Sequence, residues 1–202
     1  MGVLDALNLQ PAAVEKLRLL QALVEKWNPH INLVAKSTLP DLWARHIEDS
    51  AFLWQHAPSA GIWADFGSGG GFPGLVIAVI AQDRAAETRI VLVESDLRKA
   101  TFLREAARQM ALSVDVRSER AETLAPLGAD IVSARALTAL DGLCALAERH
   151  LAPGGTCLFP KGNKFSDEVD VARRSWQFDL EAAENPGHKG SALLVLRNLR
   201  RA

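Results

Sequence analysis

Residues 62–74 read IWADFGSGGGFPG, a short apolar run followed by a glycine-rich segment. The apolar run 62–66 predicts a buried strand. The glycines after it allow the backbone to turn sharply and to approach a ligand without a Cβ in the way. Segment 72–82 then predicts a helix, whose N-terminus presents unpaired backbone N–H groups. Strand, glycine loop and helix in this order predict a site for a nucleotide-type cofactor, the alternative being a turn that binds nothing.

Strand and helix patterns alternate through the rest of the chain. The further strands are expected at residues 89–94, 113–117, 129–133 and 156–159, and the helices at 96–111, from about 120, at 139–151 and at 166–176. Two last strands, 177–184 and 192–198, flank Pro186-Gly187 and are expected to be antiparallel neighbours. This alternation predicts a Rossmann-like α/β fold with a doubly wound, mostly parallel sheet, in which ligands bind at the carboxyl ends of the strands.

Two helices are expected ahead of the first strand. Segment 11–27 carries apolar residues at helical spacing, and Asn28-Pro29 is expected to end that helix. Segment 28–40 reads as irregular and segment 41–56 as a second helix. We therefore divide the chain into an N-terminal helical extension, residues 1–57, packed on a core domain, residues 58–202.

The composition is that of an ordinary globular protein, with 202 residues of which 49% are hydrophobic and 23% charged. No apolar run approaches the roughly 20 residues that span a bilayer, so no membrane partner is expected. Two cysteines, Cys144 and Cys157, fit a reducing cytoplasm, and five histidines without ligand spacing predict no metal. The net charge of −1 neither favours nor excludes a nucleic-acid partner.

Acidic residues beside the glycine loop bear on the identity of the cofactor. Gly69, Gly71 and Gly74 match the G-x-G-x-x-G pattern of dinucleotide sites, but Asp65 also completes D-x-G-x-G-x-G. A carboxylate there repels a pyrophosphate and attracts the sulfonium and ammonium groups of S-adenosylmethionine. Glu94 ends the second strand, where it can accept hydrogen bonds from the ribose of either cofactor. The chain has no tyrosine, which removes a tyrosine–lysine pair for hydride transfer, so the pattern favours S-adenosylmethionine.

The segment after the fourth strand, Ser133-Ala134-Arg135, bears on the methyl acceptor. It lacks the Asn/Asp-Pro-Pro-Tyr/Phe motif of enzymes that methylate exocyclic amines. Cys157 stands early in the fifth strand, away from the ligand edge, and is interpreted as core, like Cys144. A site without a base or a nucleophile suits an acceptor with a free lone pair, such as guanine N7, and catalysis by positioning. Arg135 is expected to hold the substrate or the carboxylate of the donor, the alternative being a structural pair with Asp65.

Basic and polar segments near the same edge are candidates for contact with RNA and adenine. Lys161 and Lys164 follow the fifth strand and would form a basic rim with Arg135. Further basic residues lie on the helix after the second strand, at Arg98, Lys99, Arg104 and Arg108. The alternative is that these are ordinary solvated side chains. Residues 118–122 are placed either to contact the adenine edge or to begin a capped helix.

Several longer motifs carry a resemblance to a known family. The matching segments are Trp27-Asn28, Ile31-Asn32-Leu33-Val34, Arg45-His46-Ile47-Glu48-Asp49-Ser50, Asp65 through Gly74, Glu94-Ser95, Arg120-Ala121-Glu122, Ser133-Ala134-Arg135-Ala136 and Lys161-Gly162. In these the chain resembles the ribosomal RNA small subunit methyltransferase G family, also called glucose-inhibited division protein B. The motifs W-N-x-x-I-N-L and R-H-I-x-D-S are more specific than the glycine loop, which many methyltransferases share.

The resemblance implies a class I methyltransferase with a seven-stranded sheet whose last strand is antiparallel, and N-terminal helices. It implies methylation of guanine N7 in 16S ribosomal RNA with S-adenosylmethionine, in the bacterial cytoplasm. The substrate is expected within the small ribosomal subunit and the protein is expected to be a monomer. The donor-binding residues are expected to be Gly67, Ser68, Gly69, Phe72, Glu94, Ala121, Glu122 and Arg135, with Arg135 also acting catalytically by positioning. RNA contacts are expected from Lys161, Lys164, Arg45 and His46, with helix packing as the alternative for the last two.

Three other functions stay open from the residues alone. The G-x-G-x-x-G match allows a nicotinamide-dependent oxidoreductase. The fold also allows a non-catalytic RNA-binding module, or a methyltransferase that acts on a small molecule.

Overall fold

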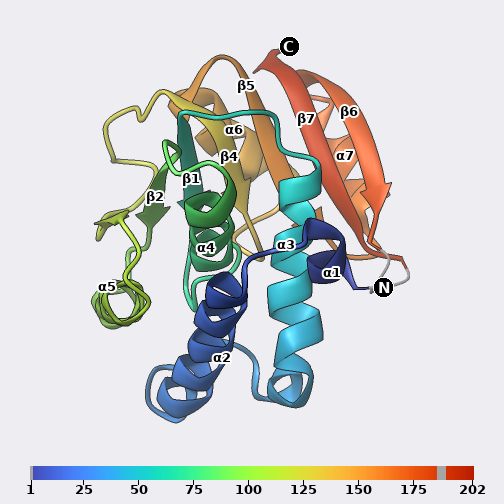
Figure 1. Cartoon of the computed structure of the whole chain (residues 1–202). Coiled ribbons are helices and arrows are strands. Elements are labelled where there is room, and N and C mark those ends of the chain that lie inside the picture. The colour runs from blue at the N-terminus through green and yellow to red at the C-terminus, as the bar shows by residue number, and fades with distance from the viewer. Residues whose placement is uncertain (1, 186–189) are drawn as a thin grey trace.

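A seven-stranded sheet in the order β3-β2-β1-β4-β5-β7-β6 forms the centre of the molecule (Figure 1). The structure is a computed structural model and describes residues 2–185 and 190–202. The strands are β1 (Ile62–Phe66), β2 (Arg89–Val93), β3 (Val114–Arg117), β4 (Ala129–Ala134), β5 (Leu151–Lys161), β6 (Trp176–Glu184) and β7 (Ala192–Arg201). Strands β1 to β5 pair in parallel, and β7 runs antiparallel to both β5 and β6. The mostly parallel sheet with an antiparallel last strand is confirmed.

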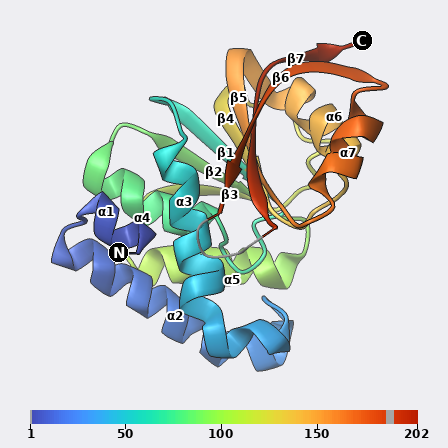
Figure 2. The same cartoon turned by 90° about the vertical axis from the view of Figure 1, so that its right-hand side faces the viewer.

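Helices cover both faces of the sheet (Figures 1 and 2). They are α1 (Val3–Leu7), α2 (Pro11–Ile31), α3 (Asp49–Gln55), α4 (Gly74–Arg84), α5 (Leu97–Gln109), α6 (Leu140–His150) and α7 (Phe165–Ala172), with a 3₁₀-helix at Lys36–Asp41 and a π-helical turn at Trp43–Glu48. Helices α2 to α5 pack on one face of the sheet, and α6 and α7 pack on the other.

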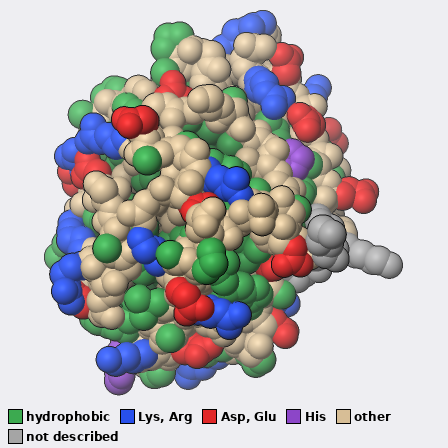
Figure 3. Space-filling view, viewed as in Figure 1, with side chains coloured by type: hydrophobic (Ala, Val, Ile, Leu, Met, Phe, Trp, Pro, Cys, Tyr) green, Lys and Arg blue, Asp and Glu red, His purple; other side chains and the backbone are tan. Residues whose placement is uncertain are grey.

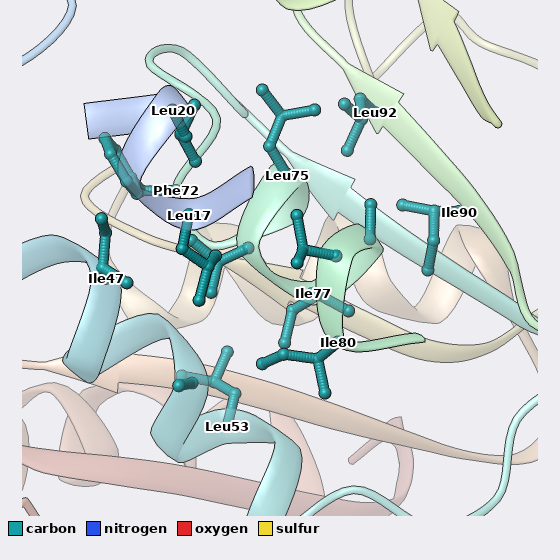
Figure 4. Close-up of a cluster of buried hydrophobic side chains, with 14 of the residues drawn as sticks. Leu17, Leu20, Ile47, Leu53, Phe72, Leu75, Ile77, Ile80, Ile90 and Leu92 are labelled. Carbon is teal, nitrogen blue, oxygen red and sulfur yellow. The ribbon is translucent and has the colours of Figure 1, made fainter. Parts of the chain in front are cut away.

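The core divides into two clusters because successive strand residues point to opposite faces. In β2, Ile90 and Leu92 pack toward α4 and α5, whereas Val91 and Val93 pack toward α6. Helix α4 is buried along nearly its whole length between the sheet and the N-terminal helices. Figure 4 shows this layer, with Leu17 of α2 and Leu53 of α3 beside Ile77 of α4. The N-terminal helices therefore pack against α4, the helix that follows the glycine loop.

The end of α2 differs from the sequence expectation. The helix does not stop at Asn28-Pro29 but continues to Ile31 and ends at Asn32, whose φ is +46°. A proline inside a helix removes one hydrogen bond and costs roughly 3 kcal/mol. Burial of Asn28, whose Oδ1 accepts a hydrogen bond from the Val34 N–H at 2.8 Å, offsets part of that cost. The expectation that a proline ends a helix considers only neighbouring residues and cannot include such tertiary contacts.

Two other boundaries also differ. No helix begins near residue 120, and residues 121–124 form a turn instead. The turn is held by the end of α6, because the Ala121 and Leu124 carbonyl groups accept hydrogen bonds from His150 and Arg149. Strand β5 begins at Leu151 rather than at Thr156, since Leu151 pairs with Ala129 before an irregularity in the ladder. The Pro186-Gly187 turn lies outside the described residues. The remaining strands and helices lie within a few residues of their expected positions, and both cysteines are buried as expected.

Over residues 2–185 and 190–202, no helix has the length and apolar character that crossing a bilayer requires. The same residues hold no group of three or more His, Cys, Asp and Glu side chains that could bind a metal ion.

Candidate active site

The loop between β1 and α4 takes backbone conformations that favour glycine. Gly67, Gly69 and Gly71 have φ values of +66°, +50° and +87°. The backbone N–H groups of Gly67 and Ser68 both donate to the Val93 carbonyl, at 2.9 and 3.2 Å, which ties the loop to the end of β2. The Ser68 hydroxyl donates to the Asp65 carbonyl at 2.9 Å and is buried. The loop is therefore held open at the carboxyl edge of the sheet by its own backbone.

Asp65 shapes this loop from beneath. It is fully buried; one carboxylate oxygen accepts from the Ser133 hydroxyl at 2.7 Å and the other from the Gly74 N–H at 3.1 Å. Burial raises the pKa of Asp65 to about 6, although both hydrogen bonds oppose the rise. Asp65 lines none of the three cavities described below. Asp65 therefore lies beneath the loop, where its bond to the Gly74 N–H fixes the start of α4.

The buried carboxyl group of Asp65 makes the stability of the fold depend on pH. Because the pKa of Asp65 is raised from 3.8 to about 6, the native state binds its proton more tightly than the unfolded state, and stability falls as the pH rises through this interval. Asp65→Asn cannot ionise. We expect its unfolding free energy, relative to the unmodified protein, to rise by roughly 2 kcal/mol between pH 4 and pH 7, measured by urea denaturation. Asp170→Asn, at an exposed position of α7, is the matched control. Parallel pH curves for Asp65→Asn and the unmodified protein would contradict this assignment.

Glu94 lies at the end of β2, against the glycine loop. Its side chain is buried; Oε2 accepts from the Gly69 N–H at 2.9 Å and Oε1 from the Asp96 N–H at 2.8 Å. A carboxylate has about four lone-pair positions, so acceptor capacity remains on both oxygens. Glu94 lines a cavity of about 330 Å³, which we call the Glu94 hollow. Other residues lining this hollow include Gly67, Lys99, Glu119, Ala121, Glu122 and Leu137.

The Glu94 hollow is closed on one side by the turn after β3. The Ala121 carbonyl accepts a hydrogen bond from Nε2 of the fully buried His150, at 2.8 Å, and Arg149 donates to the Leu124 carbonyl at 2.9 Å. Burial lowers the pKa of His150, which favours its neutral form. Glu122 is exposed and forms an ion pair with Arg120 at 3.2 Å. The sequence analysis missed His150 and Arg149, because only the three-dimensional packing brings the end of α6 to this turn.

A second cavity, the Phe72 hollow, lies on the other side of the glycine loop and measures about 440 Å³. Its lining combines residues that precede β1 with residues of the glycine loop and includes Leu33, Ala35, Thr38, His46, Ser68 and Phe72. The Arg135 guanidinium lies 5.4 Å from the centre of the Phe72 ring, donates to the Arg45 carbonyl at 3.1 Å and contacts His46 Nδ1 at 2.6 Å. These contacts, and not an ion pair with Asp65, hold Arg135.

Arg135 keeps its charge in this position. Burial lowers the pKa of Arg135 to about 10, and the charges of Asp49 and Asp65 oppose the shift. The group is therefore protonated at neutral pH. It lines the Phe72 hollow and also a third cavity of about 630 Å³, the Lys161 hollow, which lies toward β5 and β7. Ala136, the next residue, lines all three hollows, so the three cavities meet at the end of β4.

The residues expected to contact RNA differ in their surroundings. The Lys161 side chain is only 10% exposed, donates to the Thr138 carbonyl and forms an ion pair with Glu168 at 2.7 Å. His46 is buried, Arg45 is exposed at the junction of the Phe72 and Lys161 hollows, and Lys164 is exposed at the start of α7. Arg98 and Arg108 have acidic partners in Asp96 and Glu105. Figure 3 shows basic and acidic side chains interspersed over the face that it displays, without one continuous basic area.

Asp49 is a further residue that the sequence analysis did not single out. It lines both the Phe72 and the Lys161 hollow, and its Oδ1 accepts a hydrogen bond from Asn185 at 2.8 Å. Asp49 belongs to the motif R-H-I-x-D-S, and its fixed spacing from His46 in that motif could have identified it as a site residue.

The shape and charge of the hollows fit a phosphate-free nucleoside. Three carboxylates, Glu94, Glu119 and Glu122, line the Glu94 hollow together with Lys99 and Arg120, so acidic groups outnumber basic ones there and disfavour a pyrophosphate. The remaining acceptor capacity of Glu94 suits ribose hydroxyl groups, and the side-chain-free Gly67 leaves room beside Leu137, whose Cδ1 would lie 2.8 Å from an added Cβ. The residues present therefore fit an adenosyl group in the Glu94 hollow, with the remainder of the donor extending into the Phe72 hollow.

Comparison with solved structures defines the class of the fold. A SAM-dependent methyltransferase from Aquifex aeolicus superimposes with a TM-score of 0.60 at 10% identity, over 79% of this chain and 93% of that one. The M. jannaschii protein TYW2, solved in complex with AdoMet, gives 0.58 at 13% identity over 78% of this chain and 76% of the other. The fold is that of the S-adenosylmethionine-dependent methyltransferases.

Sequence comparison then gives the family. A family model described as rRNA small subunit methyltransferase G matches residues 13–193. Relatives named Ribosomal RNA small subunit methyltransferase G include one from Ruegeria pomeroyi, 48% identical over 98% of this chain and 97% of the relative. Another, from Cereibacter sphaeroides, is 50% identical over 96% of this chain and 94% of the relative. The chain belongs to the rRNA small subunit methyltransferase G family, and the resemblance found in the sequence is confirmed.

Proposed function

We propose that this protein transfers a methyl group from S-adenosylmethionine to N7 of a guanine in 16S ribosomal RNA. The observation that carries the proposal is the meeting of the three hollows at Ala136, beside Arg135, in a chain of the rRNA small subunit methyltransferase G family. The Glu94 and Phe72 hollows suit the donor. The Lys161 hollow, which is the largest of the three, suits a base taken out of its RNA stack.

The donor would be held by residues of the first two hollows. When bound, S-adenosylmethionine supplies an electrophilic methyl group on a positively charged sulfur. Glu94 would accept from the ribose hydroxyls, while Ala121 and Glu122, which line the same hollow, would border the adenine. Gly67, Ser68 and Gly69 would keep the backbone close to the ligand, and Phe72 would cover its other side. Arg135 would orient the carboxylate of the donor or the incoming base.

The surroundings of the acceptor position suit a nucleophile that has no proton to lose. Both cysteines are unsuited to covalent catalysis, because burial raises the pKa of Cys144 to about 12 and the pKa of Cys157 is also far above its ordinary value. Transfer to guanine N7 moves a positive charge from sulfur to the purine. The Asp49 carboxylate at the border of the two hollows would stabilise that charge. Catalysis is then mainly the positioning of two reactants in line.

We also propose the finer assignments. Arg45 and Lys164, which are exposed, would contact the RNA at the surface. Lys161 and His46, which are largely buried, would contribute from the walls of the hollows. Residues 1–57 are treated as an extension of the core domain 58–202. The protein would act as a monomer in the bacterial cytoplasm, on the small ribosomal subunit or on its partly assembled precursor.

Mass mapping of methylated guanines tests the proposed function. Small subunits and deproteinised 16S RNA from cells that lack this enzyme would be incubated with the protein and S-adenosylmethionine, digested and sequenced by mass spectrometry. We expect one guanine to gain a methyl group that carries the chemical signature of N7 substitution, and subunits to be the better substrate. Failure to label either RNA, or methylation at a carbon or an exocyclic nitrogen, would overturn the proposal.

A further inference from the structure

A chain of hydrogen bonds runs from the N-terminal segment to Arg135. The Thr38 hydroxyl donates to the Ala35 carbonyl at 2.8 Å and lies 2.8 Å from His46 Nε2. On the other side of the same ring, His46 Nδ1 lies 2.6 Å from an Arg135 Nη atom. Four groups thus form a line from a backbone carbonyl to the guanidinium at the junction of the hollows.

The donors and acceptors in this line determine the tautomer of His46. A hydroxyl has one proton, and that of Thr38 is directed at Ala35, so Thr38 must accept from His46 Nε2. Nε2 therefore carries the proton. An arginine only donates, so His46 Nδ1 must be unprotonated and accept from Arg135. Each member of the line has one consistent role, and the imidazole is neutral.

The ring of His46 is also held in place by packing. Its centre lies 5.1 Å from that of Phe72, and the Ser50 hydroxyl donates to the His46 carbonyl. Figure 4 shows Ile47, the residue after His46, on the same side of the buried cluster as Phe72. The imidazole is therefore a fixed acceptor against which an arginine can be oriented.

We propose that Thr38 and His46 are positioning residues that fix the direction of the Arg135 guanidinium, and that the N-terminal segment thereby sets the reacting geometry. This inference rests on the proposed function of the site. Arginine has five N–H groups in a rigid fork. Bonds to His46 and to the Arg45 carbonyl use two donors, and the fork then directs the others toward the hollows that Arg135 lines. Without His46 as acceptor, the fork is free to turn toward the Asp49 carboxylate, which lines the same two hollows.

Two substitutions and one control test this role. Thr38→Val keeps the shape of the side chain and removes the hydroxyl, and His46→Phe keeps a ring against Phe72 but removes both nitrogens. Thr101→Val is the control, because its hydroxyl also donates to a backbone carbonyl, at 2.7 Å, on the exposed side of α5. His46→Asn is the rescue variant, since its amide oxygen can stand where Nδ1 accepts from Arg135.

In single-turnover methylation of small subunits we expect Thr38→Val to be roughly fivefold slower, the effect of one neutral hydrogen bond. His46→Phe is expected to be about 30-fold slower or more, because it leaves a charged donor without its acceptor. His46→Asn should recover part of that loss, and Thr101→Val should behave as the unmodified protein. Equal rates for His46→Phe and the unmodified protein, or no difference between His46→Phe and His46→Asn, would overturn the proposal.

Nitrogen-15 NMR gives a readout that does not depend on RNA. We expect Nε2 of His46 to show the shift of a protonated ring nitrogen and Nδ1 that of an unprotonated one at neutral pH. The Arg135 side-chain signals should broaden in Thr38→Val and His46→Phe but not in Thr101→Val. A protonated Nδ1, or Arg135 signals that are unchanged in both variants, would overturn the positioning role. If these spectra agree with the proposal but the unmodified protein methylates no RNA, the positioning stands and the proposed function fails.

Discussion

Arg135→Ala is expected to slow methyl transfer roughly 100-fold or more, the usual cost of removing one preorganised charged donor from an active site. The guanidinium contacts His46, the Phe72 ring and the Arg45 backbone, and Arg135 lines both the Phe72 and the Lys161 hollow. Alanine would remove the charged group that orients the reactants at the junction of these two hollows. The rate would be measured in single turnover, with the enzyme and the donor in excess over the small subunits.

The control for this variant is Arg89→Ala, an exposed arginine at the start of β2 paired with Asp115, which should keep its full rate. Thermal unfolding should show that Arg135→Ala remains folded, since its side chain borders cavities rather than the closed core. An Arg135→Ala protein that is folded and transfers methyl groups within threefold of the normal rate would show that Arg135 has no part in the chemistry.

Gly67→Asp is expected to weaken donor binding by about 100-fold or more, because close approach of the backbone is what a glycine at such a loop provides. The φ of +66° is unfavourable for most side chains, but aspartate and asparagine tolerate this region better than other residues. The added Cβ would meet Leu137 Cδ1 at 2.8 Å, the movable end of a side chain, so the fold should survive. The carboxylate would occupy the space between the Glu94 and Phe72 hollows that Gly67 borders.

A matched control exists at Gly128, which has a similar φ of +60° and no atom within 4 Å of an added Cβ. Gly128→Asp carries the same strain and the same charge away from the hollows, and calorimetry should find its affinity for S-adenosylhomocysteine unchanged. If Gly67→Asp and Gly128→Asp bind equally well, the glycine loop does not hold the donor.

Local sequence rules predicted the elements of the core well where the local signal and the tertiary structure agree. The helix expected from residue 96 begins there, because the Asp96 carboxylate accepts from the Arg98 and Lys99 N–H groups as an N-cap does. Strand β1 lies at residues 62–66 as expected, because a buried apolar run next to a glycine loop has few other placements. The rules were wrong at Pro29 and near residue 120, where distant contacts of Asn28 and of the α6 end decide the backbone.

The site was predictable in its glycine loop and less so in its electrostatics. Glu94 borders a cavity at the end of β2 as expected, since strand order alone places it there. Asp65 instead lies beneath the loop, and Lys161 is paired with Glu168, because which carboxylate meets which cation depends on side-chain packing. The pairing of His46 with Arg135 joins residues 89 positions apart, a separation over which no spacing rule operates.

Isothermal titration of the unmodified protein tests the central claim most directly. The account predicts that S-adenosylhomocysteine binds at one site per chain with micromolar affinity, and that neither NAD nor NADP gives measurable heat. Binding of a nicotinamide dinucleotide in place of S-adenosylhomocysteine would contradict it, because a pyrophosphate would then occupy a hollow lined by Glu94, Glu119 and Glu122.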